Sequence, residues 1–232
     1  MPDKAMREIV LDTETTGFEY KQGHRLVEIG CVELENHMPT GNTYHQYINP
    51  ERDMPEGAFR VHGLSEEYLR DFPIFKEVAQ EFIDFIGDST LVIHNAGFDV
   101  PFLNWELKQH GFAEMENNVV DTLIMARKMF PGSPANLDAL CRRYQVDNSN
   151  REKHGALLDS ELLAEVYLEL IGGRQPGLLL GKNVYDDDED VKIERVFREP
   201  RPHHATEEEL AAHAAFMEKI NDPIWYRGKE GG

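Results

Sequence analysis

Four acidic residues and one histidine stand at the ends of segments that read as regular structure. Asp12 and Glu14 close an apolar run, and residues i and i+2 of a strand point to the same side. Asp99 falls near the start of a helix, and Asp159 lies in the first turn or so of an apolar helix. His154 comes just before that second helix. Carboxylates so placed predict a site for divalent cations, which prefer hard oxygen ligands.

Each of these residues alone also has an ordinary explanation. Asp12 with Glu14 can be a pair of solvated loop acids, Asp99 can cap a helix, and a histidine before a helix is often a bystander. Asp159 stands among leucines and needs a partner, for which a metal is one candidate. Taken together, the residues suit phosphodiester hydrolysis, because two cations roughly 4 Å apart can bridge such acids and a phosphate. Histidine accepts a proton near neutral pH, which suits His154 to activate the attacking water.

The elements that must position these residues predict an α/β domain over residues 1–174. Apolar runs predict strands at residues 7–12, 26–34, 43–48 and 91–93. The first three are expected to form an antiparallel meander, with a turn at 39–42 between the second and the third. Helical spacing predicts helices over residues 74–86, 100–110, 121–129, 135–143 and 156–171. Strands followed by alternating helices and strands predict a mixed sheet flanked by helices.

Composition restricts the class of protein. A net charge of −19 opposes phosphate-driven binding of nucleic acid, so a chain that handles DNA needs bound cations or a basic partner. The hydrophobic share of 41%, with no run of 18 apolar residues, predicts a soluble protein without a membrane span. No apolar signal core follows Met1, so a cytoplasmic location is expected. Cys31 and Cys141 lie in apolar segments and read as buried thiols.

Three motifs resemble the DEDD exonuclease superfamily in its histidine-containing branch, which has a ribonuclease H-like fold. They are residues 11–17 around Asp12 and Glu14, residues 94–99 ending in Asp99, and residues 154–159 from His154 to Asp159. Further segments resemble the epsilon-subunit family of bacterial DNA polymerase III, namely residues 26–30, 61–64, 121–122, 126–132 and 137–141. The resemblance covers residues 6–173.

This resemblance implies a 3′–5′ DNA exonuclease that proofreads for the replicative polymerase in the bacterial cytoplasm. It implies two divalent cations, Mg²⁺ or Mn²⁺, held by Asp12, Glu14, Asp99 and Asp159, with His154 as general base. The residues that it places at the substrate nucleotide are Asp12, Glu14, Asp159, Thr13, Thr15, Thr16, Asn95, His62 and Glu56. Gly57 is an additional residue relative to the family pattern, so the position of Glu56 is uncertain by one residue. Glu28 is a candidate partner behind the ligands and is not assigned as a ligand.

Residues 175–205 differ in character from the preceding domain and read as a linker with an acidic run at 186–190. In the epsilon family, residues 175–180 stand where a sliding-clamp-binding peptide is expected. Gln175, Leu178 and Leu180 fit an extended peptide that docks in an apolar pocket. Leu180 replaces the aromatic residue that is common in such peptides, so a plain linker remains the alternative.

Residues 206–232 predict a flexible tail that carries a short helix. Thr206 and Glu209 form a capping-box pattern, and Leu210 and Met217 lie on one face of the helix that follows. Trp225 comes after it as a candidate interface anchor. The family resemblance implies that this segment binds the catalytic (alpha) subunit of the polymerase, while a stray amphipathic tail is the alternative.

Two other functions stay open. The first is another exonuclease of the superfamily, one that trims RNA or acts alone on DNA, but such an enzyme is expected to carry basic surface of its own. The second is a non-catalytic structural subunit that only ties the polymerase to the clamp. The five intact catalytic positions argue against that second function.

Overall fold

The computed structural model describes residues 6–149, 151, 153–172 and 204–220. The chain divides into two units, Met1–Leu179 and Leu180–Gly232. The peptide predicted at 175–180 and Trp225 lie outside the described residues. No helix in the described part of the chain has both the length and the apolar character that a membrane span requires.

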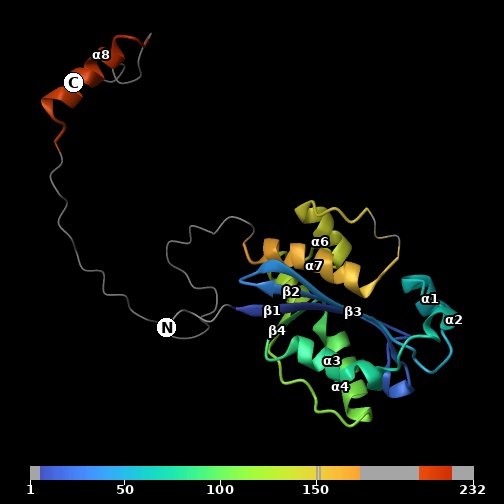
Figure 1. Cartoon of the computed structure of the whole chain (residues 1–232). Coiled ribbons are helices and arrows are strands. Elements are labelled where there is room, and N and C mark those ends of the chain that lie inside the picture. Colours follow the sequence, from blue (N-terminus) through green and yellow to red (C-terminus); the bar gives the residue numbers. More distant parts are fainter. Residues whose placement is uncertain (1–5, 150, 152, 173–203, 221–232) are drawn as a thin grey trace. The chain divides into compact units, whose positions relative to one another are not determined.

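A five-stranded mixed sheet in the order β3-β2-β1-β4-β5 forms the centre of the first unit (Figure 1). β1 (Arg7–Thr15), β2 (Leu26–Glu35) and β3 (Met38–Tyr47) form the antiparallel meander. β4 (Thr90–Ile93) runs parallel to β1, and β5 (Val119–Asp121) runs parallel to β4. The predicted mixed α/β sheet is confirmed, and the three-residue β5 is an addition.

The turn predicted at 39–42 is wrong. The chain reverses at Asn36 and His37, whose φ angles are 51° and 67°, and β3 begins directly afterwards at Met38. A two-residue hairpin loop of this kind needs positive φ at both central residues, which asparagine adopts readily. The side chain of Glu33 accepts hydrogen bonds from Thr40 and Asn42, so the segment predicted as a turn is tied to β2 as a strand.

Helices cover both faces of the sheet, and the alternation of side chains along β1 divides the core between them. Ile9 and Leu11 pack with α3 (Phe75–Ile86) and α4 (Ala96–Gln109). Val10 packs with α6 (Leu137–Tyr144) and α7 (Ala156–Leu170) on the other face (Figure 1). The remaining helices of the unit are η1 (Tyr20–Gln22), α1 (Glu56–His62), α2 (Glu66–Leu69) and α5 (Thr122–Met129).

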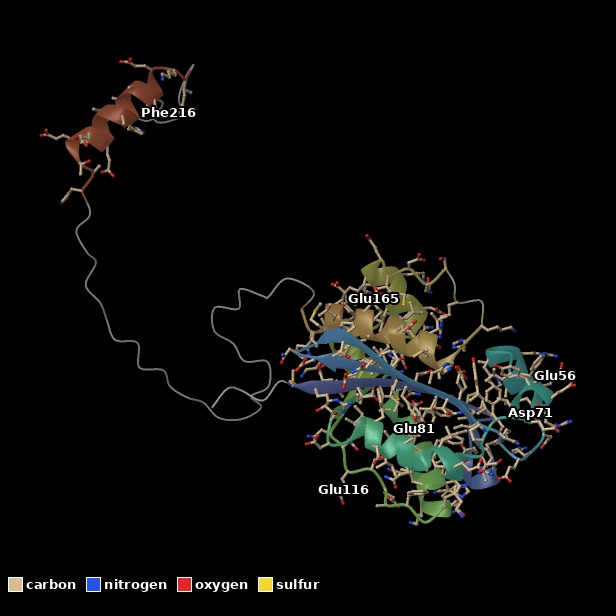
Figure 2. All side chains as sticks on the ribbon, viewed as in Figure 1. Glu56, Asp71, Glu81, Glu116, Glu165 and Phe216 are labelled. Carbon is tan, nitrogen blue, oxygen red and sulfur yellow. The ribbon has the colours of Figure 1, made fainter. Side chains whose placement is uncertain are left out.

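The second unit contains α8 (Glu207–Met217). Thr206 accepts a hydrogen bond from the Glu209 backbone amide, and the Glu209 carboxylate accepts one from the Thr206 amide, which confirms the predicted capping box. Phe216 (Figure 2) and Leu210 are exposed, whereas Met217 is buried. Leu210 and Met217, which were predicted on one face, therefore differ in exposure.

Candidate active site

Asp12 and Glu14 project toward α7. They share the parity of Val10 along β1, and Val10 packs on the α6 and α7 face. Gly30 stands directly across from Asp12 on β2. A Cβ atom on Gly30 would lie 2.2 Å from the backbone at the start of α7, so glycine is required for the helix to approach the sheet this closely. The hydroxyl of Ser160 donates to the Gly30 carbonyl at 2.9 Å and fixes that approach.

Asp99 reaches the same edge of the sheet from α4. Leu11 pairs with Ile93 in the parallel register of β1 and β4, so the chain that leaves β4 starts beside Asp12. It turns at Asn95, whose φ of 69° is left-handed, and Asp99 falls in the first turn of α4 as predicted. The hydroxyl of Thr13 donates to Asp99 Oδ1 at 2.6 Å. The two neighbouring strands thus hold Asp12 and Asp99 together.

The loop before α7 completes the site. His154 Nδ1 lies 3.1 Å from Asp159 Oδ2, and donor atoms of Glu14, His154 and Asp159 all lie within 4.8 Å of one another. The guanidinium of Arg151 binds both carboxylate oxygens of Asp159 and lies 2.7 Å from His154 Nδ1. Its third partner is Asp138 on α6, at 2.6 Å. The structure therefore brings together the predicted base and carboxylates.

Arg151 was not predicted as a site residue. A cation three residues before His154 was the available signal, because a cluster of carboxylates needs positive charge nearby. Its side chain is 7% exposed, and it links α6 to the start of α7 through its two aspartates. Arg151 thereby connects α6 with His154 and Asp159.

Burial and mutual repulsion control the charge of the four carboxylates. Burial, followed by the charges of Asp99, Glu14 and Asp159, raises the pKa of Asp12 well above its ordinary value. Burial also raises the pKa of Glu14 to about 8 and that of Asp99 to about 7. For Asp159, the hydrogen bonds from His154 and Arg151 outweigh burial and hold its pKa below the ordinary value. The repulsion among these carboxylates is relieved either by protons or by bound positive charge. A cluster of this kind therefore fits divalent cations, which bind carboxylate oxygens.

In chelator, we expect the free energy of unfolding to fall as pH rises from 4.5 to 8. These limits are the ordinary pKa of Glu14, 4.5, and its pKa in the folded protein, about 8. The folded state holds protons there that the unfolded state releases, so the free energy of unfolding falls as pH rises. Glu14→Gln removes one such group and is expected to raise Tm at pH 8. Each kcal/mol corresponds to about 2–4 °C in a protein of this size. Thermal melts across this pH range test the expectation.

Glu81→Gln is the matched control, because Glu81 is exposed on α3. It is expected to leave the pH dependence of Tm unchanged. Added Mg²⁺ is expected to raise Tm of the native chain more at pH 8 than at pH 5, since protons compete with the cation for these carboxylates. A Tm that rises with pH in chelator would contradict the repulsion described above.

The residues predicted at the substrate nucleotide lie in different surroundings. Thr13, Thr15 and Thr16 are buried at the end of β1 and just after it. His62, at the end of α1, is 5% exposed, and its Nε2 atom is buried without a hydrogen-bond partner among the described residues. Such an atom is rare in a folded protein, and a ligand that satisfies it is one explanation.

Glu56 begins the same helix, but its side chain is 76% exposed, points outward and pairs with Arg60 (Figure 2). Its contact with substrate stays a prediction, as does that of Asn95. Glu28 lies opposite Glu14 in the β1–β2 register and binds His45 Nε2 at 2.7 Å. The charge of Glu28 is the third cause that raises the pKa of Glu14, following burial and the charge of Asp159. Glu28 therefore affects the site through its charge, as a neighbour of Glu14.

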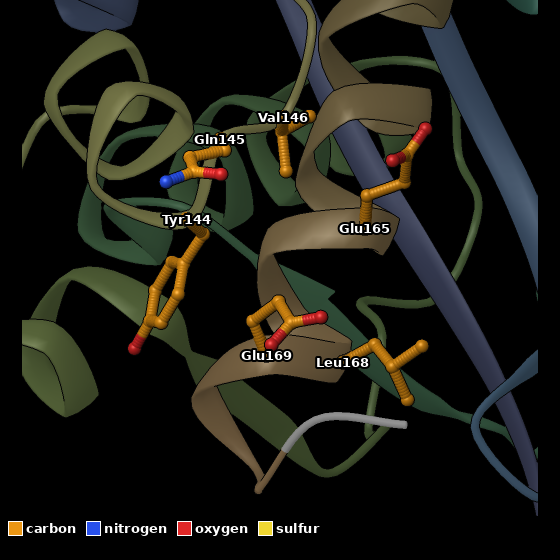
Figure 3. A pocket seen from close by; sticks show the side chains of 6 residues that line it. All are labelled: Tyr144, Gln145, Val146, Glu165, Leu168 and Glu169. Atoms are coloured by element: carbon orange, nitrogen blue, oxygen red, sulfur yellow. The ribbon is translucent and has the colours of Figure 1, made fainter. Parts of the chain in front are cut away.

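A pocket elsewhere on this unit contains no predicted site residue. It lies at the end of α6 beside the later turns of α7 and is lined by Tyr144, Gln145, Val146, Glu165, Leu168 and Glu169 (Figure 3). Its two glutamates project from one side of α7, whereas Asp159 stands at the start of that helix. The predicted catalytic and cation-binding residues therefore do not line this pocket.

Comparison with known proteins relates this site to nucleases. A family model described as "Exonuclease" matches residues 9–167. The chain is 50% identical over 226 residues to the DNA polymerase III subunit epsilon of Rickettsia felis, covering 93% of this chain and 97% of the relative. It is 44% identical over 230 residues to the subunit of the same name from Escherichia coli, covering 92% and 93%.

Solved structures share the fold. Exonuclease X in complex with 5′ overhanging duplex DNA superposes with a TM-score of 0.56 at 24% identity, covering 71% of this chain and 90% of that one. The nuclease domain of 3′hExo, a DEDDh family member bound to rAMP, superposes with a TM-score of 0.61 at 18% identity, covering 74% and 94%. At these identities the likeness shows a common fold, which agrees with the ribonuclease H-like sheet expected from the sequence.

Proposed function

Because this chain belongs to the exonuclease family of DNA polymerase III epsilon subunits, we propose that its acidic site holds two divalent cations and trims a DNA 3′ end with them. The chain is accordingly a 3′–5′ exonuclease that proofreads for a DNA polymerase. The observation that carries the two-cation proposal is the convergence of Asp12, Glu14, Asp99 and Asp159 beside one half-exposed histidine.

The four carboxylates are the ligands in this proposal, and Mg²⁺ or Mn²⁺ are the ions that suit their oxygen atoms. Bound cations would lower the pKa of the attacking water and stabilise the leaving 3′ oxygen. His154, whose side chain is 46% exposed, takes the proton from that water. Arg151 holds His154 and Asp159 in place and so keeps the base beside the ligands.

The terminal nucleotide lies on the His62 side of the acids in this proposal. The buried, unpartnered Nε2 atom supports the placement, because a phosphate or sugar oxygen would satisfy it. The backbone at Thr13, Thr15 and Thr16 would meet the terminal sugar, and Asn95 would line the same cleft. Glu56 would have to turn from Arg60 to take part.

Digestion of a 3′-mismatched DNA primer tests the function directly. The purified chain is expected to release 3′-terminal mononucleotides with Mg²⁺ and none with chelator. Matched RNA and DNA oligonucleotides run in parallel separate proofreading from RNA trimming. Faster digestion of RNA would favour the RNA-trimming alternative, and no release from either would favour a structural subunit.

The chain is proposed to reach its partners through the segment beyond the exonuclease domain. Residues 206–232 would bind the polymerase alpha subunit, and residues 175–180 would bind the sliding clamp. The exposed Leu210 and Phe216 on a well-capped α8 support the first contact, because large apolar side chains exposed on a short helix are candidate anchors at a protein interface. The polymerase would then hold the DNA, and this acidic chain would receive the frayed 3′ end.

Deletion of 206–232 is expected to abolish binding to the polymerase subunit and to spare cleavage of single-stranded DNA. The reason is that the catalytic residues and the sheet that positions them all lie before residue 174. Co-elution on gel filtration measures the binding, and nucleotide release measures the activity. A deletion of 175–180 serves as the control for chain shortening, and retained binding after the longer deletion would place the interface elsewhere.

A further inference from the structure

A second pocket opens where the chain leaves β4, and the acidic site does not use it. It encloses about 490 Å³. We call it the Arg127 pocket, and the residues that line it include His94, Asn95, Leu123, Arg127, Ser133 and Asn136. The volume falls within the roughly 300–1,000 Å³ that sites for small ligands occupy. One nucleotide unit is therefore of suitable size for it.

Arg127 differs from the other arginines of the described residues. Arg142 donates a hydrogen bond to a helix carbonyl, and Arg143 lies over the ring of Phe130. Six others form ion pairs with carboxylates, namely Arg7, Arg25, Arg52, Arg60, Arg70 and Arg151. Within the same described part of the chain, Arg127 has no hydrogen bond, ion pair or ring contact. In a chain of net charge −19, an arginine left without an acidic partner in a pocket is available to an anionic ligand.

The Arg127 pocket adjoins the reacting acids. Leu11 pairs with Ile93, so Asp12 and His94 follow neighbouring positions at the ends of two parallel strands. Asn95 lines the pocket and stands one turn before Asp99. A ligand that spans the acids can therefore continue into the pocket along the end of β4.

The sheet order places this pocket and His62 on opposite sides of the acids. β2 and β4 flank β1 on its two sides. His62 lies near Glu28 of β2 and the backbone of Thr15, whereas the pocket begins at His94 beyond β4. A strand whose terminal nucleotide occupies the His62 side can therefore extend past the acids toward the β4 side.

We propose that the Arg127 pocket binds a backbone phosphate of the DNA strand on the 5′ side of the scissile phosphodiester. This inference rests on the proposed function. A guanidinium fits a phosphate through two parallel hydrogen bonds. Asn95 and Ser133 offer polar groups for the same backbone, and Leu123 offers an apolar surface for a sugar. The pocket thus offers an arginine without an acidic partner to the phosphate backbone, in a chain whose net charge is −19.

Two substrates separate this role from catalysis. A single-stranded DNA oligonucleotide extends past the scissile phosphate, whereas the p-nitrophenyl ester of thymidine 5′-monophosphate presents only the terminal nucleotide. With Mg²⁺, Arg127→Ala is expected to raise KM for the oligonucleotide roughly tenfold, as loss of one charged hydrogen-bonded contact predicts. The slope of log kcat/KM against log salt concentration is expected to become shallower by about 0.7. Hydrolysis of the ester is expected to stay unchanged.

Two variants act as controls. Arg127→Lys keeps the charge and is expected to keep the salt slope while it loses part of the affinity, because lysine lacks the paired donors. Lys128→Ala removes an adjacent exposed charge that does not line the pocket and is expected to leave both substrates unaffected.

An unchanged oligonucleotide KM in Arg127→Ala, or equal losses on the ester and the oligonucleotide, would overturn the inference. An equal loss would mean that the substitution disturbs the acidic site rather than a separate contact. A native chain that hydrolyses neither substrate would overturn the proposed function and this inference with it, and that result is recognisable before any variant is made.

Discussion

Asp12→Asn is expected to reduce metal-dependent release of 3′-terminal mononucleotides roughly 10³-fold or more, the size of several kcal/mol of lost cation stabilisation. The charges of Asp99, Glu14 and Asp159 all raise the pKa of Asp12, after burial, so its carboxylate lies near the other three. An amide keeps the shape of the side chain and removes the negative charge. Under the two-cation proposal, the remaining acids could then not hold both ions.

The same substitution is expected to leave the fold intact and to stabilise the protein in chelator. Asp12 repels its neighbours in the absence of cations, so its neutralisation relieves that repulsion. Primer digestion and thermal melts measure the two effects, which have opposite signs. Asp71→Asn, at an exposed position outside the site (Figure 2), is the control. Near-native activity in Asp12→Asn, or a large fall in Tm, would refute the role of Asp12 as a cation ligand that repels its neighbours in chelator.

His154→Ala is expected to lower kcat by roughly 10²–10⁴-fold, the usual contribution of a positioned general base. The imidazole lies beside Asp159 and Glu14 and is half exposed, so it is open to an attacking water molecule. Single-turnover cleavage of a DNA primer measures the loss. Added imidazole is expected to restore part of the rate, because it can accept the same proton.

Binding of Mn²⁺ to His154→Ala separates a base from a ligand. His154 belongs to the group whose donor atoms lie within 4.8 Å of one another, so a ligand role is the competing explanation. Retained Mn²⁺ affinity with lost turnover supports the base, and lost affinity supports the ligand. His213→Ala is the control, since His213 is exposed on α8 and remote in sequence from the catalytic motifs. Near-normal turnover would remove His154 from both roles.

Periodicity predicted the longer elements well and the short ones poorly. β1, α3 and α7 each bury apolar side chains at regular spacing, so the sequence predicted where they lie. α1 and α2 are short and mostly exposed, and β5 has three residues, so none of them carries enough pattern to be recognised. The hairpin was misplaced because Pro39 and Gly41 suggested a turn, whereas the left-handed conformations of Asn36 and His37 made it earlier.

The sequence by itself placed Asp12 and Glu14 on one side of a strand, because residues two apart in a strand point the same way. It also placed Asp99 and Asp159 in the first turn of two helices, each near the end of a regular element. The distances among Asp12, Asp99 and Asp159 were decided only by tertiary structure. They depend on the parallel register of β1 with β4 and on Gly30, which lets α7 reach the sheet. The raised pKa values, the hold of Arg151 on His154 and the solitary Arg127 arise in the same way. Burial and charge repulsion act between atoms that are close in space, and the spacing of residues along a chain does not contain that information.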